Sequence, residues 1–153
     1  MVKDLFDSLL EEVSQTLKIP NLHADPNNTC LIQLKNGLKI QLEIESKSDS
    51  FVIGADLGEV PLGHYRNILF REALKTNGLP GSHPGILAYS NKTDHLILFK
   101  MLPLKELNGE KIASIIAPFS EKALLWKESI EKGEVPVSVN STHPSVGMFG
   151  LHP

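Results

Sequence analysis

The sequence predicts a single α+β domain with the element order α-β-β-β-α-β-β-α and a mainly antiparallel, twisted sheet. Three observations lead there. The 153 residues match the size of one ordinary domain, apolar residues recur at helical spacing in three segments, and strand-like segments lie between them. We expect the domain to cover residues 1–132. Residues 133–153 have no helical period and are rich in Ser, Pro and Gly, so we expect an extended or flexible tail.

The first half of the chain predicts one helix and a hairpin. Residues 2–17 carry an apolar stripe at helical spacing, and Pro20 follows it. Strands are expected at 30–35 and 38–45, joined by Asn36-Gly37, a pair that suits a tight hairpin. The second strand alternates apolar residues with charged or amide residues. One face of the sheet should therefore be covered and the other left available.

The second half predicts a third strand at 51–58, where Gly54 marks a candidate bulge, and a helix at 63–76. The apolar arc of that helix is wider than packing on one sheet requires. A loop rich in Gly and Pro then leads to a strand at 86–89 and another at 95–102. The last strand is apolar on both faces, so both must be covered.

The last helical region spans residues 108–132 and contains Pro118. Proline removes a backbone donor and clashes with the preceding turn, so we expect a kink or two shorter helices. The strand at 95–102 is apolar on both faces, and the helix at 63–76 has a wide apolar arc. Together they present more apolar surface than the other helices can cover. We favour a partner for this surface, with a second copy of the chain as one candidate; burial by the chain's own helices is the alternative.

Composition narrows the class of protein. The formal net charge is -3 and no run of Lys or Arg is present, which argues against nucleic-acid binding. No apolar run approaches the roughly 20 residues that span a bilayer, so we expect no membrane insertion. Cys30 is the one cysteine, which excludes an internal disulfide and suits a reducing, cytosolic compartment. Its alternating context predicts a buried structural thiol.

No motif for catalysis or for cofactor binding is present. The sequence lacks a phosphate-binding loop, a dinucleotide fingerprint, HExxH, CxxC and a nucleophile elbow. The six histidines do not have the spacing of a metal site. We therefore expect no enzyme, no cofactor and no metal. The alternative is a small enzyme that uses His83 in the loop GLPGSHPG, for which no nucleophile or orienting acid is evident.

Four segments in order resemble class I type III secretion chaperones, the family of small dimeric chaperones that includes the Tir chaperone. The opening helix FDSLLEEVSQTLKIPNL precedes a strand, and ILFREALKTN leads into a Gly-rich turn. HLILFKMLPLKELNGEKI looks like the last strand of the family with its Leu-Pro-Leu exit, and FSEKALLWKESI looks like its C-terminal helix. The resemblance covers residues 2–132.

The resemblance implies a cytoplasmic bacterial homodimer without ATPase activity. It would bind the N-terminal segment of one or more secreted effectors in extended form and keep them soluble and competent for the type III secretion system. It would also allow contact with the secretion ATPase or sorting complex. A dimeric adaptor of similar fold that is not linked to secretion is the alternative.

The resemblance also suggests where partners bind. In the helix at 63–76 we expect Phe70 and Leu74 to face outward and Ile68 and Leu69 to lie nearer the sheet. The expected dimer-interface residues come from this helix and the last strand: Ile68, Leu69, Phe70, Leu74, Ile97 and Phe99. The expected effector-binding residues come from the first helix and first strand: Leu5, Phe6, Leu9, Leu31 and Gln33. Ordinary core packing is the alternative for each of them.

Overall fold

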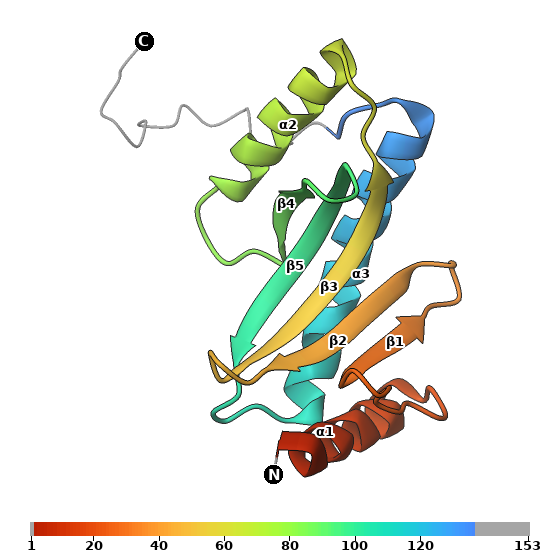
Figure 1. The fold of residues 1–153 in the computed structure, drawn as a ribbon, viewed down its shortest axis with the longest axis vertical. Coiled ribbons are helices and arrows are strands. Elements are labelled where there is room, and N and C mark those ends of the chain that lie inside the picture. The colour runs from red at the N-terminus through yellow and green to blue at the C-terminus, as the bar shows by residue number, and fades with distance from the viewer. Residues whose placement is uncertain (1, 137–153) are drawn as a thin grey trace.

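A computed structural model describes residues 2–136 and shows the predicted order of elements around one five-stranded antiparallel sheet (Figure 1). The strands lie in the order β1-β2-β3-β5-β4, so β1 and β4 are the two edges. The elements are α1 (Val2–Leu17), β1 (Thr29–Gln33), β2 (Lys39–Glu45), β3 (Ser50–Glu59), α2 (His64–Asn77), β4 (Ile86–Ser90), β5 (His95–Pro103) and α3 (Gly109–Lys132). The predicted fold class is confirmed.

Two helices cover one face of the sheet. In Figure 1, α3 runs behind the strands, α1 lies across the end near β1 and β2, and α2 lies at the opposite end beside β4. Alternate residues of the strands, such as Ile40, Ile53 and Leu98, are fully buried against this layer. Phe119 and Trp126 of α3 fill the space between helix and sheet. The opposite face carries no helix of the described chain.

α3 is one continuous helix, so the expected kink or split at Pro118 is wrong. Pro118 is exposed, and so is Ser114, whose carbonyl the missing N–H would have bonded. Water can satisfy a carbonyl on the solvent side of a helix, whereas a buried carbonyl would stay unpaired. The apolar stripe on the other side, which includes Ile116 and Phe119, holds the two halves in line.

The bulge in β3 lies later than Gly54. Pairing between β3 and β5 is regular at Gly54 and shifts between Asp56 and Gly58. Gly58 has a φ of 112°, which only glycine adopts easily, and its N–H donates to Oδ1 of Asp56 at 2.9 Å. The bulge is therefore fixed by a glycine and a neighbouring carboxylate.

α1 and α3 cross closely where α3 begins. The backbone N–H of Gly109 donates to Oε2 of Glu12 at 2.6 Å, so a carboxylate from α1 caps the first turn of α3. A Cβ at position 109 would lie 2.2 Å from Cβ of Glu12. The crossing therefore requires glycine at this position.

α3 ends at Gly133, which takes the left-handed conformation of a helix C-cap with a φ of 69°. The hydroxyl of Tyr65 donates to the carbonyl of Glu134 at 2.8 Å and so ties the chain after α3 to the first turn of α2. The remainder of the predicted tail, residues 137–153, lies outside the described residues. Across residues 2–136, no helix is both long and apolar enough to cross a membrane.

Candidate functional site

The open face of the sheet carries a shallow, mainly apolar hollow of about 510 Å³. Its apolar lining includes Leu31 of β1, Val52 of β3, and Ile97 and Phe99 of β5. Leu31 is 61% exposed, and the other three are half-buried. Charged side chains of β2 and β3 stand among them: Lys39, Glu43 and Asp56. Apolar surface bordered by charge is typical of a protein-binding face.

Strand β1 leaves its outer edge available. Facing residues of an antiparallel pair alternate between those that exchange hydrogen bonds and those that do not. Leu34 N–H donates to the carbonyl of Leu38 at 2.9 Å, and continuing this alternation directs Ile32 toward β2. Leu31 and Gln33 then point their N–H and C=O groups away from the sheet, and none of these groups has a hydrogen-bond partner outside the sheet within residues 2–136. A partner strand could bond to them.

Strand β4, the other edge, is blocked at Leu87 by a side chain of α2. The amide of Asn77 donates through Nδ2 to the carbonyl of Leu87 at 2.9 Å and accepts the Leu87 N–H through Oδ1 at 2.9 Å. One side-chain amide thus makes the pair of bonds that a neighbouring strand would make. The sequence predicted only that a helix ends near residue 76, since nothing local shows that the amide of Asn77 reaches β4.

Helix α2 is rotated relative to the sequence-based expectation. Leu74 faces outward as expected, 72% exposed, but so does Ile68 at 37%, which was placed nearer the sheet. Phe70 is half-buried instead, with its ring centroid 5.0 Å from that of Tyr89 on β4. Leu69 is fully buried within the chain itself. Leu69 therefore supports the helix from inside, and Ile68 and Leu74 form its exposed apolar surface.

The expected effector-binding residues fall into two groups. Leu31 and Gln33 are exposed on β1, and Leu5 is 44% exposed on α1. Phe6 and Leu9 belong to the core, where Phe6 packs edge-on against an aromatic ring of β3. The structure thus leaves Leu31, Gln33 and Leu5 available to a partner, with only Leu31 in the hollow itself.

The loop that contains His83 is held in place by two lysines. Lys100 of β5 donates through Nζ to the carbonyl of His83 at 2.6 Å, and Lys122 of α3 donates to the carbonyl of Gly85 at 2.8 Å. A Cβ at position 85 would lie 2.9 Å from Leu98, so the loop also packs tightly on the sheet. Within residues 2–136, no hydrogen bond joins the His83 ring to a hydroxyl, thiol or acid. The enzyme alternative gains no support here.

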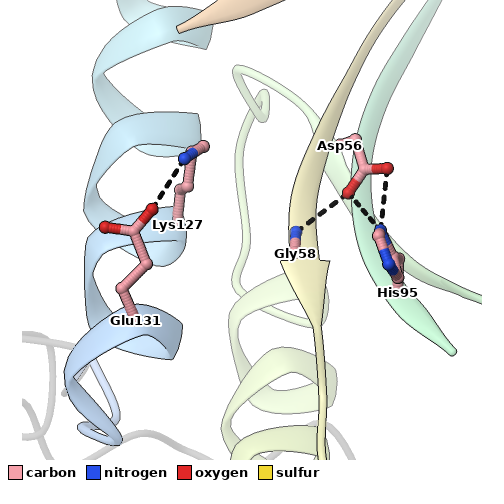
Figure 2. A network of polar contacts seen from close by, with 5 residues as sticks. All are labelled: Asp56, Gly58, His95, Lys127 and Glu131. Carbon is pink, nitrogen blue, oxygen red and sulfur yellow. Dashed lines mark hydrogen bonds and ion pairs between the residues drawn. The ribbon is translucent and has the colours of Figure 1, made fainter. Parts of the chain in front are cut away.

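A second histidine, which the sequence did not single out, is paired with a carboxylate. Nδ1 of His95 lies 2.7 and 2.8 Å from the two carboxylate oxygens of Asp56, between neighbouring strands (Figure 2). A catalytic triad would need a nucleophile bonded to the other ring nitrogen; no such bond occurs in the described part of the chain. Figure 2 also draws the ion pair between Lys127 and Glu131 of α3. Its atoms lie 2.7 Å apart, and an exposed pair of this kind contributes about 0.3–0.5 kcal/mol.

The described residues show neither an exposed cysteine nor a metal-binding cluster. Cys30 is buried, and burial raises the pKa of its thiol above the ordinary value, as expected for a structural cysteine. No group of three or more His, Cys, Asp or Glu side chains within residues 2–136 is placed to hold a metal ion.

Comparisons with known proteins agree with this geometry. A chain of the HopA1–SchA chaperone–effector complex is 19% identical with a TM-score of 0.66, covering 81% of this chain and 94% of that one. A chain of the Yersinia pestis type III secretion chaperone SycH bound to a fragment of YscM2 is 18% identical with a TM-score of 0.63, covering 79% and 98%. A chain of the ExoU–SpcU complex from the type III secretion system of Pseudomonas aeruginosa is 17% identical with a TM-score of 0.62, covering 81% and 98%.

Identities this low show a shared fold. No curated protein sequence matches the chain significantly. The model of the Tir chaperone protein (CesT) family, however, matches residues 8–127, most of the domain described above. The chain therefore belongs to the Tir chaperone protein (CesT) family, the class I type III secretion chaperones.

Proposed function

We propose that the protein is a bacterial cytoplasmic chaperone that binds the N-terminal segment of one or more secreted effectors in extended form. It would keep these effectors soluble and competent for the type III secretion system. The observation that carries the proposal is the free edge of β1 beside the apolar hollow, while the β4 edge is blocked at Leu87 by Asn77. Structures of similar fold include chaperones in complex with effectors.

Strand pairing at β1 is one part of the proposed binding. Each new backbone hydrogen bond contributes about 0.5–1.5 kcal/mol net, whereas ordering each residue of a disordered segment costs about 1–2 kcal/mol. Pairing with Leu31 and Gln33 alone therefore does not hold the segment. Apolar side chains must also be buried, at about 25 cal/mol per Å². We expect the segment to place apolar residues at alternate positions, so that they enter the hollow beside Leu31.

We further propose that the protein is a homodimer. The exposed surface formed by Ile68 and Leu74 on α2 supports this, together with half-buried Phe70. Ile97 and Phe99 of β5 would join the interface at their end of the hollow, which leaves the end at Leu31 for the effector segment. A two-fold dimer uses the same patch on both copies, so an apolar patch of this kind can cover itself. We expect the loaded dimer to be recognised by the secretion ATPase or sorting complex.

Proline substitutions test strand addition directly. The N–H groups of Leu31 and Gln33 point away from β2, so proline at either position removes a donor for the partner and none from the sheet. The matched control is Ile32→Pro, which removes a bond to β2 and should destabilise the fold. Each variant is co-expressed with candidate effectors from the type III secretion system of the source bacterium.

We expect Leu31→Pro and Gln33→Pro to fold like the wild type and to lower the amount of soluble effector at least several-fold. Full solubilisation by both variants would show that β1 does not receive the segment. Light scattering of the wild type tests the dimer proposal independently of effector binding. A mass near that of one chain, 16.9 kDa, would refute the dimer. A wild type that solubilises none of the candidates would count against the chaperone proposal itself.

A further inference from the structure

Two lysines beneath the loop GLPGSHPG carry positive charge that the described chain does not neutralise. Lys100 projects from β5 on the helix-covered side, in register with buried Ile53, and Lys122 projects from α3. Their Nζ atoms bond to the carbonyls of His83 and Gly85, which are two residues apart in one loop. The two ammonium groups therefore share one small region at the β4 side of the sheet.

The electrostatics of this region are unusual for a surface lysine. Burial lowers the pKa of Lys122 below its ordinary value, and the positive charge of Lys100 lowers it further. No carboxylate is among the causes that act on Lys122, and neither lysine forms an ion pair within residues 2–136. By contrast, Lys127, five residues further along α3, is neutralised by Glu131 at 2.7 Å.

Holding the loop does not require this charge. An uncharged donor such as Gln could bond to the carbonyl of Gly85 without the cost of desolvating a cation. Each ammonium group has three donors, and the structure uses one from each for the loop. The other donors and the uncompensated charge suit an anion that would bridge the two lysines. A carboxylate, with two acceptor oxygens, matches that arrangement.

We propose that Lys100 and Lys122 form a binding site for an Asp or Glu side chain of the polypeptide that the chaperone carries. This site rests on the proposed function and adds a specificity contact to it. The contact lies near the β4 edge of the sheet, far from the β1 edge. The bound segment would run extended from the β1 edge around the protomer and present an acidic residue to the loop. The site would favour segments with an acid at that position over segments with an amide.

The site can be tested on the free, full-length chain. Lysine side-chain resonances are followed by NMR while acetyl-Gly-Asp-Gly-amide, its Asn counterpart or inorganic phosphate is added. We expect the Asp peptide to shift the resonances of Lys100 and Lys122 saturably, with a Kd on the order of millimolar. The Asn peptide should bind at least tenfold more weakly, and added salt should weaken the Asp peptide. Lys127 serves as the control within the same spectra.

Matched variants separate charge from loop support. Lys122→Gln removes the charge but keeps a donor for Gly85, and Lys122→Met removes both. We expect both variants to lose the Asp-peptide shift, with the loop resonances unchanged in Lys122→Gln. Equal shifts from the Asp and Asn peptides, or equal shifts at Lys127, would overturn the proposal. Saturation by phosphate without saturation by the Asp peptide would overturn the assignment to a carboxylate.

Co-expression with effectors distinguishes failure of the proposed acidic contact from failure of the chaperone proposal. Lys122→Gln should lower effector solubilisation several-fold while the wild type solubilises fully. If the wild type works and Lys122→Gln works equally well, the acidic contact is refuted and the chaperone function stands. If the wild type solubilises no candidate but the Asp peptide still binds, the chaperone proposal has failed independently of the site.

Discussion

Replacing Asn77 by leucine would open the second edge of the sheet. Leucine has the same branched skeleton but can neither donate to the carbonyl of Leu87 nor accept its N–H, both now bonded at 2.9 Å. Two lost bonds at about 0.5–1.5 kcal/mol each give about 1–3 kcal/mol. Leu87 is only 5% exposed, so water reaches its backbone poorly. We therefore expect a loss of about 2–4 kcal/mol, a large share of the 5–15 kcal/mol typical of a domain.

Urea unfolding followed by circular dichroism at fixed protein concentration measures this loss. The matched control is Asn67→Leu on the same helix, where the side chain is exposed and makes no hydrogen bond within the described residues. The unpaired β4 edge should also make Asn77→Leu aggregate with increasing concentration in size-exclusion chromatography. The reasoning is refuted if Asn77→Leu unfolds within 0.5 kcal/mol of Asn67→Leu and elutes as the wild type does.

Three further predictions follow from local geometry. Gly109→Ala should cost about 1–3 kcal/mol in urea unfolding, because its Cβ would meet the main chain and Cβ of Glu12; an unchanged midpoint would contradict the close crossing. Hydrogen bonds from Thr29 hold the pKa of Asp25 below its ordinary value of 3.8, so its stabilising contribution is complete above that value and is lost as pH falls through the lower folded-state pKa. The difference in free energy of unfolding between the wild type and Asp25→Asn should therefore become smaller as the pH falls. A difference that stays constant down to the lowest pH would argue against this. Cys30, whose burial raises its thiol pKa, should react with a thiol reagent only after unfolding; rapid labelling of native protein would show it is accessible.

The sequence predicted the elements that depend on local pattern. Regular alternation in β2 fixed both the strand and its covered face, because a shift of one residue would have exposed Ile40 and Leu42 together. The exposed positions of Leu31 and Gln33 followed from the same periodicity on β1. That β1 is an edge strand, with the backbone groups of these two residues unpaired, is known only from the structure.

Features that depend on contacts distant in sequence were not predictable. Ile68 and Phe70 are both apolar and two residues apart, so the sequence could not decide which faces outward. The structure decides it through Tyr89, whose ring packs on Phe70, and through Arg66, whose guanidinium lies 5.3 Å from the Tyr89 ring centroid. The amide of Asn77 is similar, because its partner Leu87 lies ten residues away across a loop.

The difference between the two edges of the sheet also limits self-association. An open-ended stack of sheets needs two free edges on every molecule, so that each copy can receive one neighbour and offer itself to the next. Here Asn77 occupies the backbone groups of Leu87 on β4, so β1 offers the longer run of unpaired edge groups within the described residues. Two copies that met through β1 would use up both β1 edges and leave only the partly blocked β4 edges for further growth. The side chain of Asn77 therefore disfavours open-ended stacking of the folded protein through its sheet edges.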